Sequence, residues 1–157
     1  MTFSESFLSP LGQISVFSDG NDITEVRFVC CESEHGDEIT EEAVRQLREY
    51  FEGERTEFSL PLSPKGTPFQ KRVWSALTEV EYGTVRTYKD IAQAIGSPGA
   101  CRAVGGANGK NPIVIIIPCH RIVASGGKPG GYSAGLDKKL YLLELENKYA
   151  KKGRYPQ

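Results

Sequence analysis

The stretch Ile113–Val123, with the sequence IVIIIPCHRIV, begins with five consecutive β-branched residues. A half-exposed strand would alternate apolar and polar positions, so this run predicts a strand that is buried on both faces. Pro118 cannot donate a hydrogen bond to a neighbouring strand, and regular pairing is expected to end there. Whatever follows Pro118 is therefore expected to be held at the end of a packed, rigid support.

Three reactive or charged side chains follow that proline: Cys119, His120 and Arg121. Thiolate is the reactive form of cysteine and cationic neighbours favour it, so Cys119 is a candidate nucleophile with a depressed pKa. Unpaired cysteine is also among the most buried residue types and often only fills space. From these residues alone, the nucleophilic and the structural interpretation are equally supported.

This stretch resembles the active-site signature of the O6-alkylguanine-DNA alkyltransferases, and the resemblance runs from about Thr67 to Glu146 in the family's order and spacing. The matching segments outside the signature are Gly83–Val85, Tyr88, Ile91–Ala92, Arg102–Ala107, Asn111–Pro112, Tyr132–Ser133 and Gly135–Leu136. The resemblance implies DNA repair by direct reversal. In such repair an alkyl group moves from guanine O6, and as a second substrate from O4-alkylthymine, to Cys119 once per protein molecule.

The charge is divided unevenly along the chain. The net charge is −1 over 157 residues, but residues 1–66 carry 14 acidic and 5 basic side chains, whereas residues 67–157 carry 6 acidic and 14 basic ones. The second part therefore suits an anionic partner such as double-stranded DNA, although a basic surface can also be merely solvated. Leu62–Gly66 has the composition of a linker, which predicts two domains, 1–66 and 67–157.

The cysteines give no sign of a metal site, since Cys30, Cys31, Cys101 and Cys119 form no C-x-x-C pair and the chain has only two histidines. We expect neither a metal nor another cofactor. Sparse thiols fit a reducing compartment. The start of the chain lacks the pattern of a targeting signal, and no segment approaches the roughly 20 apolar residues of a membrane span. We therefore expect a cytoplasmic protein without membrane contact, and a monomer.

The N-terminal part is predicted to be a scaffold. Alternating runs at Phe3–Leu8, Gln13–Phe17 and Ile23–Cys30 are separated by turn signals, which predicts an antiparallel meander. A helical pattern that begins at Thr40 and ends at Gly53 predicts one helix covering that sheet. By resemblance this domain is ribonuclease H-like.

The C-terminal part is predicted to be mainly helical, which makes the fold class α+β. Thr67, Pro68 and Gln70 have the pattern of a capping box that starts a helix. Two shorter helices, joined through Gly96–Gly99, then form a helix-turn-helix, of the winged-helix kind in the family.

The second helix of that motif is unusually thin, because its small residues are Ala100, Ala103, Gly105, Gly106 and Ala107. Each glycine within a helix costs about 1 kcal/mol against alanine, so another surface is expected to approach the backbone closely. That surface is either a neighbouring helix or DNA. The long cation Arg102 favours DNA.

By resemblance, this helix enters the minor groove and Arg102 fills the space left by a flipped nucleotide. The implied DNA-contacting residues are Arg102, Tyr88, Ala103, Gly105, Gly106 and Arg121. Tyr88 is also implied to hydrogen-bond the flipped base, although a half-buried aromatic at a helix start is an ordinary feature. The implied alkylguanine pocket is lined by Val114, Val123, Tyr132 and Ser133, beside the glycine-rich loop 124–131.

Glu146 lies at the edge of the apolar face of the last predicted helix and holds the family position of the acidic partner of His120, with Glu144 as the alternative. Asn111 is implied to brace the turn before Cys119. Neighbouring side chains in an extended segment point to opposite sides, so a water is expected to bridge His120 and Cys119. The expected relay is then Glu146 to His120 to water to Cys119: Glu146 orients His120, and His120 activates the Cys119 thiol through the water.

Two rival interpretations remain. A DNA-binding module without chemistry fits the helix-turn-helix, but the related non-catalytic proteins carry tryptophan in place of Cys119. A thiol hydrolase would use Cys119, His120 and Glu146, but would not explain the basic half or Arg102.

Overall fold

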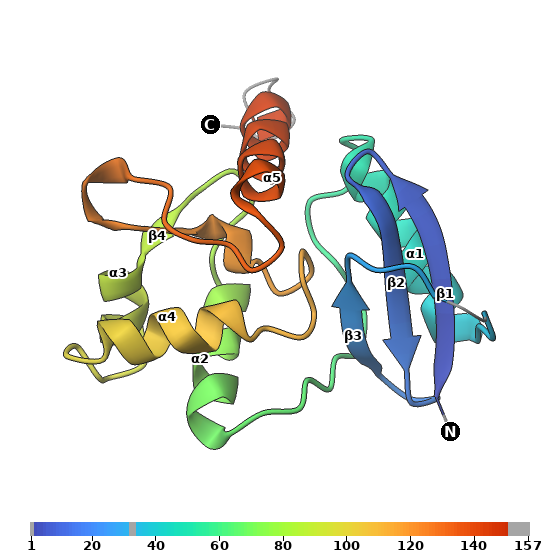
Figure 1. Ribbon diagram of the computed structural model, residues 1–157, viewed down its shortest axis with the longest axis horizontal. Coiled ribbons are helices and arrows are strands. Elements are labelled where there is room, and N and C mark those ends of the chain that lie inside the picture. Colours follow the sequence, from blue (N-terminus) through green and yellow to red (C-terminus); the bar gives the residue numbers. More distant parts are fainter. Residues whose placement is uncertain (1, 32–33, 151–157) are drawn as a thin grey trace. The chain divides into compact units, whose positions relative to one another are not determined.

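In the computed structural model of the protein, which describes residues 2–31 and 34–150, the N-terminal strands form the predicted antiparallel meander (Figure 1). β1 (Phe3–Ser9) pairs with β2 (Gly12–Ser18), which pairs with β3 (Ile23–Arg27). Gly12 closes the first turn with a φ of +104°, a conformation that glycine adopts without strain. The third strand ends at Arg27 rather than at the predicted Cys30.

One helix, α1 (Glu38–Phe51), covers a face of this sheet (Figure 1). Its N-cap is Asp37, whose carboxylate accepts from the Thr40 backbone N–H at 2.9 Å, so Thr40 is the third helical residue rather than the cap. The buried side chains between helix and sheet include Phe7, Ile14, Val16, Ile23, Val26, Ala43, Leu47 and Tyr50. The predicted sheet with one covering helix is therefore confirmed.

The rest of the chain is mainly helical, as predicted. Its elements are α2 (Pro68–Thr78), β4 (Arg86–Thr87), α3 (Tyr88–Ala94), α4 (Cys101–Gly109), η1 (Cys119–Arg121), β5 (Ile122–Val123), η2 (Ser125–Gly127) and α5 (Leu136–Tyr149). The capping box at Thr67 is present, since its hydroxyl accepts from the Gln70 N–H while the Gln70 side chain accepts from the Thr67 N–H. The buried Trp74 indole donates to Ala107 O at 2.8 Å and anchors α2 to α4.

The helix-turn-helix consists of α3 and α4, which pack against each other and against α2. Thr87 caps α3, and the short strand that ends in Thr87 pairs in parallel with β5. Arg86 is opposite Ile122, and Thr87 is opposite Val123. The helix-turn-helix is thereby joined to the segment that follows Cys119.

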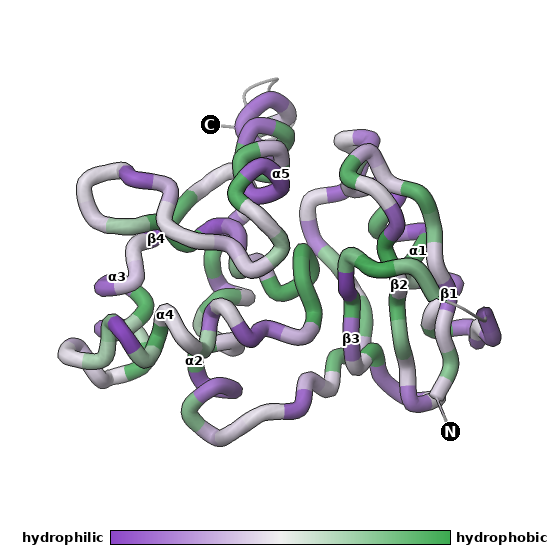
Figure 2. Tube along the Cα trace, viewed as in Figure 1, coloured by the Kyte–Doolittle hydropathy of each residue, from purple (hydrophilic) through white to green (hydrophobic). Residues whose placement is uncertain are grey.

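The predicted strand from Ile113 to Ile117 is wrong, although all five side chains are buried. The run is coloured as hydrophobic along the trace in Figure 2. Only Ile113 pairs with a strand, through a parallel bridge to Val26. The chain then turns, and Ile115 takes a φ of +71°. A buried turn and a buried strand place the same demand for apolar side chains on the sequence, so the run of β-branched residues could not separate them.

The chain divides into two compact units. Unit 1 holds the described residues up to Lys65 together with Pro112–Val114, and unit 2 holds Gly66–Asn111 and the described residues from Ile115 onward. The domain limits taken from the sequence, 1–66 and 67–157, stay a prediction. Among the helices of residues 2–31 and 34–150, none is long and apolar enough to cross a membrane.

Candidate active site

Cys119, His120 and Arg121 lie on the single 3₁₀ turn η1 and are almost completely buried, with 2%, 0% and 6% of their surfaces exposed. The turn is held by Cys119 N–H to Ile117 O at 2.7 Å and by Arg121 N–H to Pro118 O at 3.0 Å. The extended conformation expected here is therefore corrected to a 3₁₀ turn. With three residues per turn, the Cys119 and His120 side chains still diverge.

Glu146 of α5 is the carboxylate that faces this turn. Its Oε2 lies 2.7 Å from His120 Nε2, and its two oxygens accept from Arg121 Nε at 2.8 Å and Arg121 Nη2 at 2.9 Å. Its Oε1 also accepts from the Gly83 N–H at 3.2 Å. Glu146 is 1% exposed, whereas Glu144 is exposed. The geometry therefore brings Glu146, and not Glu144, to His120.

Charges in this cluster fix the state of the imidazole. Burial alone would raise the pKa of Glu146, but His120 and Arg121 outweigh burial and hold it well below its usual range. Burial lowers the pKa of His120, and the opposing effect of the Glu146 carboxylate is smaller. An ionised carboxylate only accepts, so Nε2 carries the proton and Nδ1 is an acceptor. Within the described residues, the buried Nδ1 has no hydrogen-bond partner.

The Cys119 thiol differs from the sequence-based expectation of a depressed pKa. Burial raises the pKa of Cys119, and the opposing effects of Asn111, Tyr132 and Lys139 are smaller. The expectation was wrong because it considered the cationic neighbours of Cys119 but not its desolvation. The resting protein therefore holds a neutral thiol beside a neutral imidazole.

Two asparagines at the end of α4 hold the backbone on either side of Pro118. Asn111 Nδ2 donates to Ile117 O at 2.8 Å, and Asn108 Nδ2 donates to Cys119 O at 3.3 Å. The sequence analysis named Asn111 but missed Asn108. A signal was present, because Asn108 is a polar residue at the core-facing helical position next to Ala107 and four after Val104.

The face of α4 away from the core is open. Arg102, Ala103 and Gly106 are exposed, and Gly105 is partly exposed. A Cβ added at Gly106 would meet nothing within 4 Å. Within the described residues, no neighbouring helix therefore requires glycine at position 106, and this face of the thin helix is accessible.

Tyr88, the first residue of α3, lies between α4 and the glycine-rich loop. A Cβ on Gly105 would lie 3.8 Å from the Tyr88 ring, and one on Gly130 would come within 2.9 Å of its hydroxyl. Gly130 also has a φ of +72°, so both its conformation and its space favour glycine. The half-buried Tyr88 thus touches both the helix and the loop that the resemblance places around a flipped base.

Arg121 was expected among the DNA-contacting residues, and the structure corrects this. Its guanidinium donates to both oxygens of Glu146 and, through Nη1, to Val80 O at 2.7 Å. Its side chain is 7% exposed. A guanidinium engaged in this way is an internal brace and has no face to offer a phosphate.

The expected pocket residues lie in different surroundings. Val123 is buried in β5, Ser133 is exposed, and Val114 belongs to unit 1, where its N–H donates to Val26 O at 3.2 Å. The Tyr132 hydroxyl is buried near Cys119 and acts to lower the pKa of the thiol. Among residues 2–31 and 34–150, no three His, Cys, Asp or Glu side chains are arranged to hold a metal ion.

Comparison with known proteins gives the same result for both parts of the chain. Residues 68–148 match the DNA binding domain of 6-O-methylguanine DNA methyltransferase, and residues 4–64 match the ribonuclease-like domain of 6-O-methylguanine DNA methyltransferase. The methylated-DNA–protein-cysteine methyltransferase of Methanosarcina acetivorans is 47% identical over 148 residues, covering 89% of this chain and 95% of the relative. The chain belongs to the 6-O-methylguanine DNA methyltransferase family.

Solved structures of this methyltransferase family share the fold. The O6-methylguanine methyltransferase of Mycobacterium tuberculosis is 44% identical with a TM-score of 0.86, covering 95% of this chain and 94% of that one. The M. tuberculosis OGT in complex with DNA is 44% identical with a TM-score of 0.87, covering 94% of each chain. The predicted α+β fold with a helical DNA-binding domain is confirmed.

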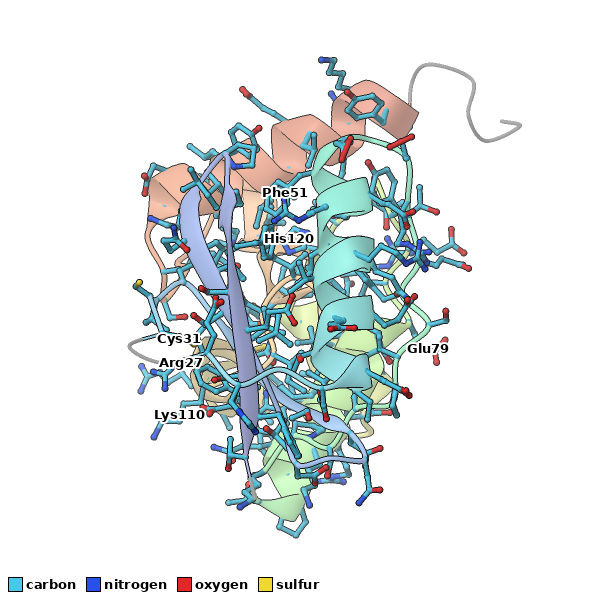
Figure 3. The ribbon with its side chains drawn as sticks, turned by 90° about the vertical axis from the view of Figure 1, so that its right-hand side faces the viewer. Arg27, Cys31, Phe51, Glu79, Lys110 and His120 are labelled. Carbon is cyan, nitrogen blue, oxygen red and sulfur yellow. The ribbon has the colours of Figure 1, made fainter. Side chains whose placement is uncertain are left out.

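Within that methyltransferase fold, unit 2 holds Cys119, His120, Glu146 and Asn111 as buried residues, whereas Tyr88 is half-buried and Arg102 is exposed. Figure 3 shows His120 in the interior and Lys110, at the end of α4, at the periphery. One further buried residue, Lys139, escaped the sequence analysis, since nothing in the sequence of α5 distinguishes it from Lys138 or Lys148 of the same helix.

Proposed function

We propose that this protein repairs DNA by direct reversal, as a methylated-DNA–[protein]-cysteine S-methyltransferase that acts on O6-alkylguanine in duplex DNA. The observation that carries the proposal is the buried Cys119 on a braced turn, backed by the His120–Glu146 pair, in a chain of this methyltransferase family. Because a buried neutral thiol is inert toward most reagents, the site would react only with a substrate delivered into it.

Activation begins from the neutral thiol. A water between Cys119 Sγ and His120 Nδ1 accepts the thiol proton and passes its own proton to the ring, whose Nδ1 is the unpartnered acceptor. Glu146 stabilises the resulting imidazolium. The thiolate then attacks the alkyl carbon, the bond from that carbon to guanine O6 breaks, and the electron pair stays on the base. The Tyr88 hydroxyl donates toward the departing base.

Delivery of the substrate requires the damaged nucleotide to leave the base stack, since an alkyl group inside a duplex cannot reach an interior sulfur. The exposed Arg102 on the thin helix α4 is suited to occupy the vacated space in the minor groove. Tyr88 lies against Gly105 of α4 and against Gly130 of the loop, so its hydroxyl is available to a flipped base held between helix and loop. Ala103, Gly105 and Gly106 let the DNA backbone approach the helix.

The product is a thioether, which offers water no carbonyl to attack, so each molecule reacts once. A thioester formed by a hydrolase would instead be open to hydrolysis by the same histidine. This difference separates alkyl transfer from the hydrolase interpretation, and transfer itself separates it from a binding module without chemistry.

Duplex DNA carrying a labelled methyl group on guanine O6 tests the proposal. The demethylated product should equal the active protein added and then stop accumulating. Mass spectrometry should find one added methylene mass on the peptide with Cys119 and none on Cys30, Cys31 or Cys101. Cys119→Ala should bind the duplex without transfer, and Cys101→Ala should transfer normally. Sustained turnover, or label on another cysteine, would contradict the proposal.

Three aspects of its setting stay predictions from the sequence: action as a monomer, a cytoplasmic location and activity on O4-alkylthymine. Sedimentation of the protein with and without duplex DNA measures the first. Competition between duplexes carrying O6-methylguanine and O4-methylthymine measures the third.

A further inference from the structure

A buried ion pair joins two elements of unit 2, because Arg121 lies on η1 and Glu146 lies on α5. The guanidinium donates to both carboxylate oxygens, at 2.8 and 2.9 Å. Paired bonds of this kind fix the two side chains relative to each other but not their place in the fold. The distance from Glu146 to His120 therefore depends on what holds the pair from outside. The α2–β4 turn, residues 80–83, bonds both members of the pair.

Each contact of the α2–β4 turn suits the charge that it meets. Val80 O accepts from Arg121 Nη1 at 2.7 Å, and the Tyr82 ring centroid lies 5.7 Å from the guanidinium carbon. The Gly83 N–H donates to Glu146 Oε1 at 3.2 Å. The turn thus presents an acceptor and a ring face to the cation, and a donor to the anion.

The hydrogen bonds of Glu146 direct its two oxygens to different neighbours. Oε2 lies 2.7 Å from His120 Nε2, whereas Oε1 accepts from the Gly83 N–H. Glu146 is 1% exposed, and a buried acceptor that loses its donor is destabilised because water does not replace that donor. The Gly83 N–H therefore keeps Oε1 at the turn, which leaves Oε2 directed at the imidazole.

A side chain at position 83 would disturb this contact. Gly83 has a φ of +78°, and a Cβ there would lie 2.8 Å from the Cβ of Ala150, the C-cap of the helix that carries Glu146. The turn or the helix would then shift, because carbon atoms in contact lie about 3.5–4.0 Å apart. Gly96 has a φ of +77°, but a Cβ there meets nothing within 4 Å. The two glycines therefore separate backbone strain from contact with the helix of Glu146.

We propose that Gly83 is a positioning residue for alkyl transfer, whose backbone N–H and bare Cα hold one oxygen of Glu146 at the α2–β4 turn so that the other oxygen stays aligned with His120. The proposal rests on the proposed function in one respect, that His120 and Glu146 activate Cys119. The alignment itself exists without DNA and can be measured without it.

The charges around His120 stay the same when residue 83 changes. Arg121 on η1, together with Glu146 and Lys139 on α5, acts on the imidazole. Gly83 has no side chain, so its replacement by alanine adds and removes no charge. A change in the state of the imidazole then reports a change in the position of Glu146.

NMR of the imidazole protons and nitrogens measures that position in the free protein, with His35, the other histidine of the chain, as internal reference. Gly83→Ala should move the His120 Nε2–H proton upfield, because its hydrogen bond to Glu146 lengthens. The same variant should slow alkyl transfer about tenfold, since a misplacement of about 1 Å can cost about 100-fold. Gly96→Ala is the matched control, and it should lower the melting temperature but leave the resonance and the rate unchanged.

A second variant tests the Gly83 N–H alone. Glycolic acid in place of Gly83 exchanges the backbone N–H for an ester oxygen and adds no Cβ, so its result does not depend on whether the turn tolerates alanine. The ester oxygen repels Glu146 Oε1. The His120 Nε2–H resonance should again move, while the resonances of His35 stay.

The proposal is overturned if the ester variant keeps the His120 resonances of the parent, or if Gly96→Ala moves them as far as Gly83→Ala does. Either result would leave Gly83 with a role in the turn alone. Because the NMR measurement uses no DNA, absence of alkyl transfer in the parent with the His120 shifts as expected would count against the proposed function and not against this inference.

Discussion

Arg102 and Arg121 belong to the same unit but differ in their exposure and in their hydrogen bonding. Arg102 is exposed on α4 and makes no hydrogen bond or ion pair within the described residues. Arg121 is buried on η1, where Glu146 and Val80 O accept its hydrogen bonds. A guanidinium that recognises a partner must keep its donors unused, whereas one that supports chemistry must have them all engaged.

The same contrast extends to the surroundings of each arginine. The exposed face of α4 is made of small residues and contributes little to the core. The cluster around Cys119 is shielded from water, so a charge in it is destabilising unless an opposite charge or hydrogen bonds compensate it. Substitutions on the α4 face should therefore change DNA repair without changing stability, and those in the cluster should change both.

Glu146→Gln should give the largest effect on stability. It leaves Arg121 buried without its carboxylate, which should lower the free energy of unfolding by about 3–5 kcal/mol. It should also slow alkyl transfer, because the imidazolium of His120 loses its counter-charge, while DNA affinity stays nearly unchanged. Urea unfolding and single-turnover rates measure the two effects. Glu144→Gln removes an exposed carboxylate from the same helix and should change stability by less than about 0.5 kcal/mol.

Acidification should weaken the cluster in two steps. The pKa of His120 is lowered in the folded state, so below its ordinary value of 6.5 the unfolded chain takes up a proton that the folded chain does not, and stability falls as the pH falls. The pKa of Glu146 is also lowered, so a second loss begins below its ordinary value of 4.5. A tenfold difference in proton affinity between the folded and unfolded chains corresponds to about 1.4 kcal/mol of stability.

His120→Gln separates these steps in urea unfolding at pH 7.5, 5.5 and 4. The variant should lose the dependence between pH 7.5 and 5.5 that comes from His120 and keep the loss at lower pH that comes from Glu146. An unchanged dependence in the upper range would show that the imidazole is not held neutral by burial.

Gly106→Ala should give the smallest effect on the fold and sharpen the contrast. A Cβ there meets nothing within 4 Å, and Gly106 is not among the glycines of positive φ, so alanine should stabilise the helix by about 0.5–1 kcal/mol. Repair of duplex DNA should nevertheless fall, because the added methyl group faces the DNA. Thermal unfolding and repair rates measured together test this opposite response.

Gly130→Ala is the matched glycine substitution on the loop. A Cβ there would come within 2.9 Å of the Tyr88 hydroxyl at a φ of +72°, so it should destabilise the protein and slow repair together. If Gly106→Ala also destabilised the protein while it slowed repair, the exposed face of α4 would have a packing role, and the contrast between that face and the buried cluster would fail.

Most of the fold could be predicted from local sequence patterns. The capping box at Thr67 and the turn signals of the meander depend on neighbours a few residues away, so both were predictable. The resemblance singled out Glu146 as the partner of His120, because its place at the edge of an apolar face left Glu144 as an alternative. The conformation of Ile113–Ile117 was not, because its burial comes from distant segments and its side chains suit a turn as well as a strand.

Long-range packing also decided what was missed in the site. Arg121 was predicted to contact DNA because the sequence does not show that Glu146, on α5, accepts its hydrogen bond. The expected depression of the Cys119 pKa counted nearby charges, which the sequence displays, and omitted desolvation, which only the fold creates. Lys139 and Asn108 are ordinary polar residues in the sequence and become distinctive only through their burial.

Arg102→Ala measures the division between recognition and chemistry most directly, through alkyl transfer from duplex DNA and from the free O6-alkylguanine base. Because flipping costs a few kcal/mol and the free base needs none, the duplex rate should fall roughly 10- to 100-fold while the free-base rate and the unfolding free energy stay unchanged. Lys110→Ala, which removes another exposed cation at the end of α4, should lower the duplex rate far less. Equal losses on the duplex and on the free base would contradict the account.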